Sequence, residues 1–278
     1  MTTQTLSTQA ISSLQILRGK HAVVFGAGGS VGSAVARQFA SEGAEVFLAG
    51  RTKSSVEDTT NQIIEAGGRA HPAVIDALDD VAVNKYIDSI VKQTGSIDVV
   101  FNAVGPLAKD YGNTKNALDL TIEQFMLPVN TVLRSQFITA RAAARHMVKQ
   151  HSGVIIFLTG GPAGAHIEGT TAIGAAFGAV ESLTRNLALD VSPAGVRVVC
   201  VRSSAMTDSR TIQQSIDVVA ETTKVSKEQV MGRIASLTML KVPASVADTA
   251  NAVAFVASDR ARMMTANVIN STGGAVED

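Results

Sequence analysis

Residues 21–32, HAVVFGAGGSVG, decide the fold class of this 278-residue chain. A short apolar run ends in a cluster of glycines, and a helical pattern follows in which Val31, Val35 and Phe39 recur at every fourth position. That pattern stops at Gly43, a residue type that commonly ends helices. Glycines let the main chain approach a pyrophosphate closely, and a helix N-terminus supplies free N–H groups and a positive dipole. The stretch therefore predicts a strand, a phosphate-binding loop and a helix, and with them dinucleotide binding.

Seven short runs along the chain are rich in Val, Ile and Phe and alternate with helical patterns. Because the runs are apolar on both faces, they are typical of parallel strands covered by helices on both sides. The predicted fold class is α/β: a single-domain Rossmann fold with a doubly wound seven-stranded parallel sheet, whose ligands bind at the carboxyl edge of the strands. The expected strands are His21–Phe25, Glu45–Ala49, Ala70–Ile75, Asp98–Asn102, Val154–Thr159, Val196–Val201 and Asn267–Asn270.

Helix starts are marked by two capping boxes, Thr121–Gln124 and Ser226–Gln229. The first is expected to open a long helix that runs towards Gln150. The segment 205–242 follows a strand and reads as mostly helical, so we predict that it forms a substrate lid. Residues 1–18 are predicted to be a polar tail, and residues 19–278 a single dinucleotide-binding catalytic domain.

Composition narrows the class of protein further. With 46% hydrophobic and 17% charged residues the chain can bury a sizeable core. Its formal net charge is zero and it has no basic block, so nucleic acid is not an expected partner. No run approaches the ~18 apolar residues of a membrane helix, and we read no signal peptide. The one cysteine, Cys200, lies in an apolar run and suits a reducing compartment. We therefore expect a cytoplasmic protein without a membrane partner.

The end of the second expected strand indicates which dinucleotide is bound. An acidic residue at this place would bind the ribose 2′-hydroxyl of NAD. The sequence instead reads Gly50, followed by Arg51-Thr52-Lys53. An arginine fork with nearby hydroxyls suits a 2′-phosphate through charge-assisted hydrogen bonds. The alternative interpretation is a solvated loop with two ordinary surface charges, and the sequence favours NADP(H) over NAD(H).

Several further marks, in their order and spacing, resemble the short-chain dehydrogenase/reductase family from about residue 18 to the C-terminus. Asn102-Ala103-Val104-Gly105 resembles the family's Asn-Asn-Ala-Gly, and Ser203-Ser204 occupies its usual Pro-Gly. Gly195-Val-Arg-Val-Val leads into a strand as the family's pattern does, and Thr265 through Gly274 resembles its closing motif.

The resemblance implies roles for single residues. Asp76 would lie near the adenine, Thr207 would meet the nicotinamide amide, and Asn130 would organise a catalytic water. Ser30 stands where the family often has glycine, and its hydroxyl could bond a phosphate. Together with the glycine loop, this gives the predicted cofactor-binding residues Gly26, Gly28, Gly29, Ser30, Val31, Gly32, Arg51, Thr52, Asp76, Ala77, Asn102, Ala103 and Thr207.

The family's proton-transfer residues are missing from this chain. The family places a tyrosine and a lysine four residues apart on one face of its fifth helix, where the lysine lowers the pKa of the tyrosine. Aligned on Val180–Arg185, the tyrosine position holds Ile173 and the lysine position Phe177. The partner serine, thirteen residues before the tyrosine, is Gly160. A tyrosine three residues earlier, as in enoyl reductases, would be Thr170, which restores nothing.

Two other residues are candidates for the missing acid or base, beside Asn130. His166 lies in the loop after the fifth expected strand, and an imidazole is a common general acid or base. Tyr111 lies in the loop after the fourth and is the phenol best placed for a substrate. A plain loop histidine and a packed loop tyrosine are the competing interpretations. No histidine and carboxylate show metal-ligand spacing, so no metal is expected.

These observations favour an NADP(H)-dependent oxidoreductase of the short-chain type. Hydride transfer depends mainly on placing the nicotinamide beside an acceptor, so a mostly hydrophobic carbonyl, imine or activated alkene would suit a site without the Tyr–Lys pair. Ile173 and Phe177 are expected to line an apolar pocket floor. Two alternatives stay open: a non-catalytic NADP(H)-binding regulator or inactive partner, and a non-redox lyase or cyclase on the same fold. The small residues of 174–179 agree with a homodimer or homotetramer, as the resemblance implies, or with burial inside one subunit.

Overall fold

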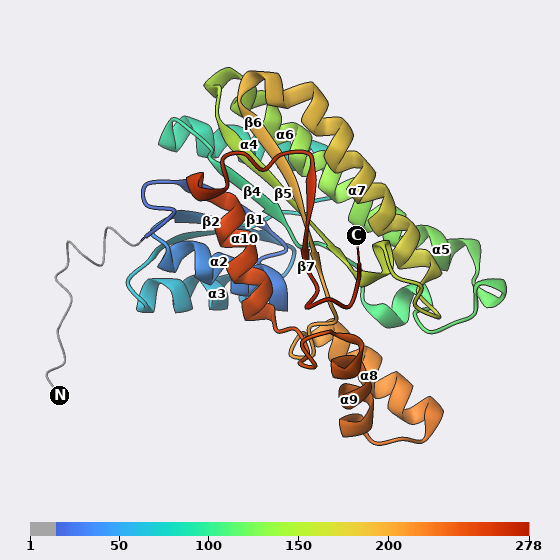
Figure 1. The fold of residues 1–278 in the computed structure, drawn as a ribbon. Coiled ribbons are helices and arrows are strands. Elements are labelled where there is room, and N and C mark those ends of the chain that lie inside the picture. Colours follow the sequence, from blue (N-terminus) through green and yellow to red (C-terminus); the bar gives the residue numbers. More distant parts are fainter. Residues whose placement is uncertain (1–14, 278) are drawn as a thin grey trace, which may run out of the picture.

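A parallel sheet of seven strands forms the centre of the molecule, and the predicted fold is confirmed (Figure 1). The structure is a computed structural model that describes residues 15–277. The strands lie in the order β3-β2-β1-β4-β5-β6-β7, and every neighbouring pair is parallel. Their bounds are β1 His21–Phe25, β2 Glu45–Gly50, β3 Arg69–Val74, β4 Val99–Asn102, β5 Gly153–Gly160, β6 Val196–Ser203 and β7 Asn267–Ser271.

Helices cover both faces of the sheet because both faces are apolar. One core contains Val24, Val46 and Ile156 from the sheet, and the other contains Val23, Phe47 and Ile155. The first is covered by α2 Ser30–Ser41, α3 Lys53–Glu65 and α10 Val246–Ala257, and the second by α4 Asp80–Thr94, α6 Arg134–Gln150 and α7 Thr171–Val191 (Figure 1).

The expected long helix from Thr121 to Gln150 is real but interrupted. Thr121 caps α5 (Ile122–Pro128) with the predicted capping box. A π-helical turn, η3 (Val129–Leu133), then joins α5 to α6. The main chain is widened there directly after Pro128, which has no N–H to give to a regular helix. Such π turns often occur at functional sites, and this one carries Asn130.

Two helices stand beyond the end of β6 and make up most of the predicted lid segment (Figure 1). They are α8 (Arg210–Thr223) and α9 (Lys227–Leu237), and Ser226 caps α9 with the predicted capping box. Short turns complete the connections: η1 Ala108–Tyr111, η2 Ala117–Asp119, η4 Gly161–Ala163, η5 Ser192–Ala194 and η6 Asp259–Ala261. Within residues 15–277, no helix is both long and apolar enough to cross a membrane.

The predicted end of the polar tail at residue 18 is wrong. Leu17 is fully buried in the core under α2, and its N–H donates to the Glu42 carbonyl at 2.9 Å. Gln15 also reaches the fold, because its Nε2 donates to the Ser41 carbonyl at 3.2 Å. The error arose because the apolar run Ile16-Leu17 is too short to be assigned to the fold from the sequence alone. Residues 1–14 of the predicted tail lie outside the described residues.

Substituting Leu17→Ala tests whether this segment belongs to the domain. Removing a fully buried leucine side chain leaves a cavity, so we expect a loss of about 2–5 kcal/mol in the free energy of unfolding, measured by urea denaturation. The matched control is Leu118→Ala, where the side chain is 94% exposed and the expected change is within about 0.5 kcal/mol. Equal effects of the two substitutions would contradict the packing described above.

Candidate functional site

A crevice is expected at the carboxyl end of β1, because the order of the strands reverses there. β1 has β2 on one side and β4 on the other, so the loops that follow β1 and β4 leave the sheet next to each other. The N–H of Ala103 donates to the Phe25 carbonyl at 3.0 Å and joins the two loops. A Cβ added at Gly26 would lie 3.0 Å from the carbonyl carbon of Ala103, so the first loop passes very close to the second.

The glycine loop forms a cradle that side chains would fill. Gly26 has a φ of +77°, which favours glycine. A Cβ at Gly32 would lie 2.2 Å from the Gly26 carbonyl oxygen, and one at Gly28 would lie 2.8 Å from the Cβ of Ser55. The N–H of Gly29 donates to Gly26 O at 3.0 Å and closes the turn in front of α2, where Val31 is half-buried. The residues present therefore fit a pyrophosphate against the N-terminus of α2.

Beyond the cradle lie the predicted contacts to the adenosine half. Arg51 and Thr52 are exposed at the junction of β2 and α3, and the Thr52 side chain makes no capping bond. Asp76 is exposed after β3, and its Oδ1 accepts from the N–H of Leu78 at 3.0 Å, while Ala77 is buried. The structure thus leaves the Arg51 side chain at the edge of the crevice in contact with solvent.

Asn102 is turned into the fold and supports the crevice from behind. Its Nδ2 donates to Thr139 Oγ1 at 3.0 Å, and its Oδ1 accepts from the N–H of Val104 at 2.8 Å. The side chain is 1% exposed. Asn102 therefore shapes the loop after β4, and the neighbouring Ala103 main chain is the part of this loop that faces Gly26.

The predicted lid segment, residues 205–242, touches the glycine loop through Ser30. The hydroxyl of Ser30 accepts from the N–H of Arg210, the first residue of α8, at 3.1 Å. Thr207 is half-buried at the base of the lid, where its N–H donates to the Ala244 carbonyl at 3.2 Å and its carbonyl accepts from Gln213 Nε2. The hydroxyl that was expected to bond a phosphate thus meets the lid in this structure.

Two residues predicted at the positions of the family's catalytic residues, Gly160 and Phe177, lie in contact. A Cβ added at Gly160 would lie 3.1 Å from Cε2 of Phe177, so the ring stands where a serine side chain would otherwise begin. Phe177 is half-buried, and its neighbour Ile173 is 7% exposed and packs into the core. Of the two residues expected to line an apolar pocket floor, Ile173 is packed in the core and Phe177 is the more exposed. Phe177 is left as the apolar surface beside Gly160.

The three catalytic candidates are placed differently. Tyr111 is 6% exposed and belongs to the core, and burial raises its pKa to about 12. A phenol in that environment keeps its proton near neutral pH, which favours the packing interpretation. His166 is exposed on the loop between β5 and α7, and Asn130 is exposed on the π turn. His166 lies at a hollow of about 670 Å³ between this loop, the end of α9 and the C-terminal segment.

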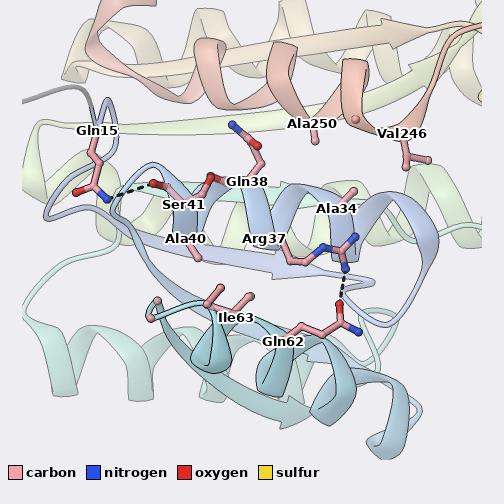
Figure 2. A pocket seen from close by; sticks show the side chains of 14 residues that line it. Gln15, Ala34, Arg37, Gln38, Ala40, Ser41, Gln62, Ile63, Val246 and Ala250 are labelled. Carbon is pink, nitrogen blue, oxygen red and sulfur yellow. Dashed lines mark hydrogen bonds between the residues drawn. The ribbon is translucent and has the colours of Figure 1, made fainter. Parts of the chain in front are cut away.

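A second groove lies away from these residues. Figure 2 shows this groove, of about 550 Å³, between α2, α3 and α10. Its walls include Ala34 and Ile63, and a hydrogen bond of 3.0 Å from Arg37 Nη1 to Gln62 Oε1 crosses it (Figure 2). None of the predicted site residues lines it. Among the residues that the structure describes, no three His, Cys, Asp or Glu side chains are grouped to hold a metal ion.

A buried polar cluster next to Gly160 was missed by sequence reasoning. Glu181 of α7 and Arg202 of β6 form an ion pair whose side chains are each 8% exposed. Thr159 donates to Glu181 at 3.1 Å and contacts the thiol of Cys200, and burial raises the pKa of that thiol to about 12. The available signal was a charged residue, Arg202, directly after the apolar run Val198–Val201.

Comparisons with known proteins agree with this fold and crevice. The family model described as enoyl-(acyl carrier protein) reductase matches residues 26–276. Versicolorin reductase stcU of Emericella nidulans is 29% identical over 93% of this chain and 96% of its own length. The uncharacterized oxidoreductase YxbG of Bacillus subtilis is 28% identical over 93% of this chain and 91% of its own.

Solved structures share the fold. The crystal structure of NAD⁺-bound xylitol dehydrogenase has a TM-score of 0.84 at 24% identity, over 91% of this chain and 98% of its own. A 7α-hydroxysteroid dehydrogenase complexed with NADH and 7-oxo glycochenodeoxycholic acid has a TM-score of 0.82 at 23% identity, over 96% and 98%. Fold and crevice define a nicotinamide-dependent oxidoreductase. The chain belongs to the short-chain dehydrogenase/reductase family.

Gly32→Ala tests the cradle. Because the added Cβ would lie 2.2 Å from a main-chain oxygen, the loop must move, and we expect the rise in melting temperature caused by NADPH to be lost. The measurement is thermal unfolding with and without NADPH. In the control Gly232→Ala, on α9, the added Cβ meets nothing within 4 Å, so the NADPH-induced rise should stay intact. A full NADPH response from Gly32→Ala would show that the cradle does not bind the dinucleotide.

Proposed function

We propose that this protein is an NADP(H)-dependent oxidoreductase that transfers hydride to a mostly hydrophobic carbonyl, imine or activated alkene without a Tyr–Lys pair. The observation that carries the proposal is the contact between Phe177 and Gly160, which replaces two polar catalytic positions by a close apolar one. A reductase activity also agrees with the name of the relative versicolorin reductase.

The chain's own residues would hold the dinucleotide along the carboxyl edge of the sheet. The cradle from Gly26 to Gly32 would take the pyrophosphate, and Arg51 with Thr52 would take a 2′-phosphate through charge-assisted hydrogen bonds. Asp76 and Ala77 would lie at the adenine, and Thr207 would orient the nicotinamide amide. When bound, the nicotinamide supplies or accepts the hydride.

The contact between Gly160 and Phe177, which we call the apolar edge, selects the hydride acceptor. Phe177 excludes water from one side of the reacting position and offers no proton, so a substrate that is already polarised needs the least help there. A conjugated alkene or an iminium meets this demand better than a plain ketone, because loss of general acid–base catalysis typically costs ~10²–10⁴-fold in rate. His166 is exposed at the neighbouring hollow and is the candidate for delivering a proton from its ring nitrogen.

A homodimer or homotetramer is proposed as the working state. Within the small-residue run of α7, Gly174 is packed inside the subunit, since an added Cβ would lie 2.9 Å from the Pro162 carbonyl. Gly178 faces open space, and Leu189 near the end of the helix is 76% exposed. Part of the run therefore serves the subunit itself, and the remainder is free to meet a second copy.

Arg51→Ala tests the choice of cofactor. Loss of a charge-assisted pair with the 2′-phosphate should weaken NADPH binding about 10-fold to 100-fold and leave NADH binding nearly unchanged. Isothermal titration with both dinucleotides measures the two dissociation constants. Lys92→Ala on α4 removes an exposed cation far from β2 and should change neither. NADH binding tighter than NADPH in the unaltered protein would contradict the proposed specificity.

A substrate panel tests the reaction. With NADPH followed at 340 nm, we expect conjugated enones or cyclic imines to be reduced at least ~10²-fold faster than saturated ketones of the same size. His166→Ala should lower kcat on the best substrate, whereas Tyr111→Phe should leave the pH profile unchanged between pH 6 and 9, because the tyrosine pKa of about 12 lies above that window. A rise in melting temperature with NADPH, without consumption by any substrate, would favour a binding protein instead.

A further inference from the structure

The ion pair between Glu181 and Arg202 is bidentate and nearly closed to solvent. Arg202 Nε donates to Glu181 Oε1 and Nη2 donates to Oε2, both at 2.8 Å. Glu181 lies on α7, and Arg202 is the second-last residue of β6, so the pair joins a helix to the carboxyl edge of the sheet. Two parallel N–H···O bonds fix the plane of the guanidinium as well as its distance.

The pair lies beside the residues that replace the family's catalytic groups. Glu181 accepts from Thr159 Oγ1, and Thr159 immediately precedes Gly160. Glu181 also follows Phe177 by four residues on α7, which places the two side chains on the same face of the helix. The Glu181 carboxylate is therefore linked to Gly160 through Thr159 of β5, and to Phe177 through helix α7.

The guanidinium also supports the segment that carries His166. We call residues 161–168, between β5 and α7, the β5–α7 segment. A Cβ added at Gly164 would lie 3.3 Å from Arg202 Nη1 and 2.9 Å from Cγ1 of Val276, so the segment rests directly on the guanidinium and on the C-terminal chain. Gly164, His166 and Val276 all line the hollow of about 670 Å³.

Packing alone gives no reason for a charged pair at this place. Removing two charges from water is costly, and an apolar pair of similar volume often stabilises a fold equally well. What an apolar pair cannot do is fix orientation through directed bonds. The directed bonds of the Glu181–Arg202 pair join three elements, α7, β6 and β5. The loop that rests on the pair contains short turns such as η4.

We propose that Glu181 and Arg202 are positioning residues that order the β5–α7 segment and hold Gly160 and His166 at the substrate. The ordering of the β5–α7 segment is inferred from the contacts of Glu181 with Thr159 and of Arg202 with the chain at Gly164. Its consequence for turnover rests on the proposed function. Neither residue touches the reacting atoms; both act through the segment.

The test compares the whole protein with a double variant, Glu181→Leu with Arg202→Met, which keeps volume and removes the directed bonds. Hydrogen exchange measured by mass spectrometry should show amides of residues 161–168 exchanging at least ~10-fold faster, with β5 and β6 unchanged. On a substrate found by the panel, kcat should fall ~10-fold or more while the dissociation constant of NADPH changes less than about 2-fold.

Two controls keep the outcome interpretable. Asp80→Leu with Arg141→Met removes an ion pair of 2.6 Å between α4 and α6, and it should leave exchange in 161–168 as it is. If the double variant does not fold, Arg202→Lys takes its place. This substitution keeps the charge and loses the bidentate geometry, so the amides of residues 161–168 should again exchange faster.

The outcomes separate cleanly. Unchanged exchange of 161–168 in the double variant, or in Arg202→Lys when only that variant folds, would overturn the proposal. Faster exchange with unchanged kcat would overturn its catalytic half. Failure of the proposed function is seen elsewhere, as an unaltered protein that neither binds NADPH nor consumes it, and the exchange measurement does not depend on either.

Discussion

The cofactor crevice depends on a main-chain contact that excludes every side chain. Helix α2 begins so close to the loop before it that a Cβ at Gly32 would lie 2.2 Å from the carbonyl oxygen of Gly26. Only glycine allows this approach. It places the N-terminus of α2 at the end of β1, where the strand order reverses and a phosphate can meet free N–H groups. The neighbouring loop after β4 is fitted to the same turn through Ala103.

A second glycine contact decides the chemistry at the other end of the crevice. The sequence predicts Gly160 and Phe177 at the positions of the family's serine and lysine, and the two residues fit each other, because the ring lies 3.1 Å from where a Cβ at residue 160 would be. The absence of a serine at residue 160 and the presence of a phenylalanine at residue 177 are therefore linked. A serine restored at residue 160 alone would meet the ring of Phe177. The site is better described as an apolar edge than as a catalytic site with residues removed.

Much of the fold follows from the sequence because its signals are local. Strand β1 begins and ends at the predicted residues, and the capping boxes at Thr121 and Ser226 form as expected. Misses arise where a long-range contact decides. Leu17 is buried by α2 and the turn at Glu42, a contact that the short apolar run Ile16-Leu17 does not indicate. Likewise, the Ser30 hydroxyl accepts from the N–H of Arg210, 180 residues away, a contact that no local pattern indicates.

The buried ion pair bears on the same apolar edge. Arg202 is a permanent cation close to the substrate side of the sheet, yet Glu181 accepts from both its Nε and its Nη2, so the pair is neutral as a unit. It therefore cannot replace the family's lysine, whose positive charge lowers the pKa of a neighbouring phenol. Under the proposed function, polarity for the reaction would come from the acceptor itself or from a group that solvent can reach. In this chain His166 is such a group, and the segment that carries it rests on the neutral pair.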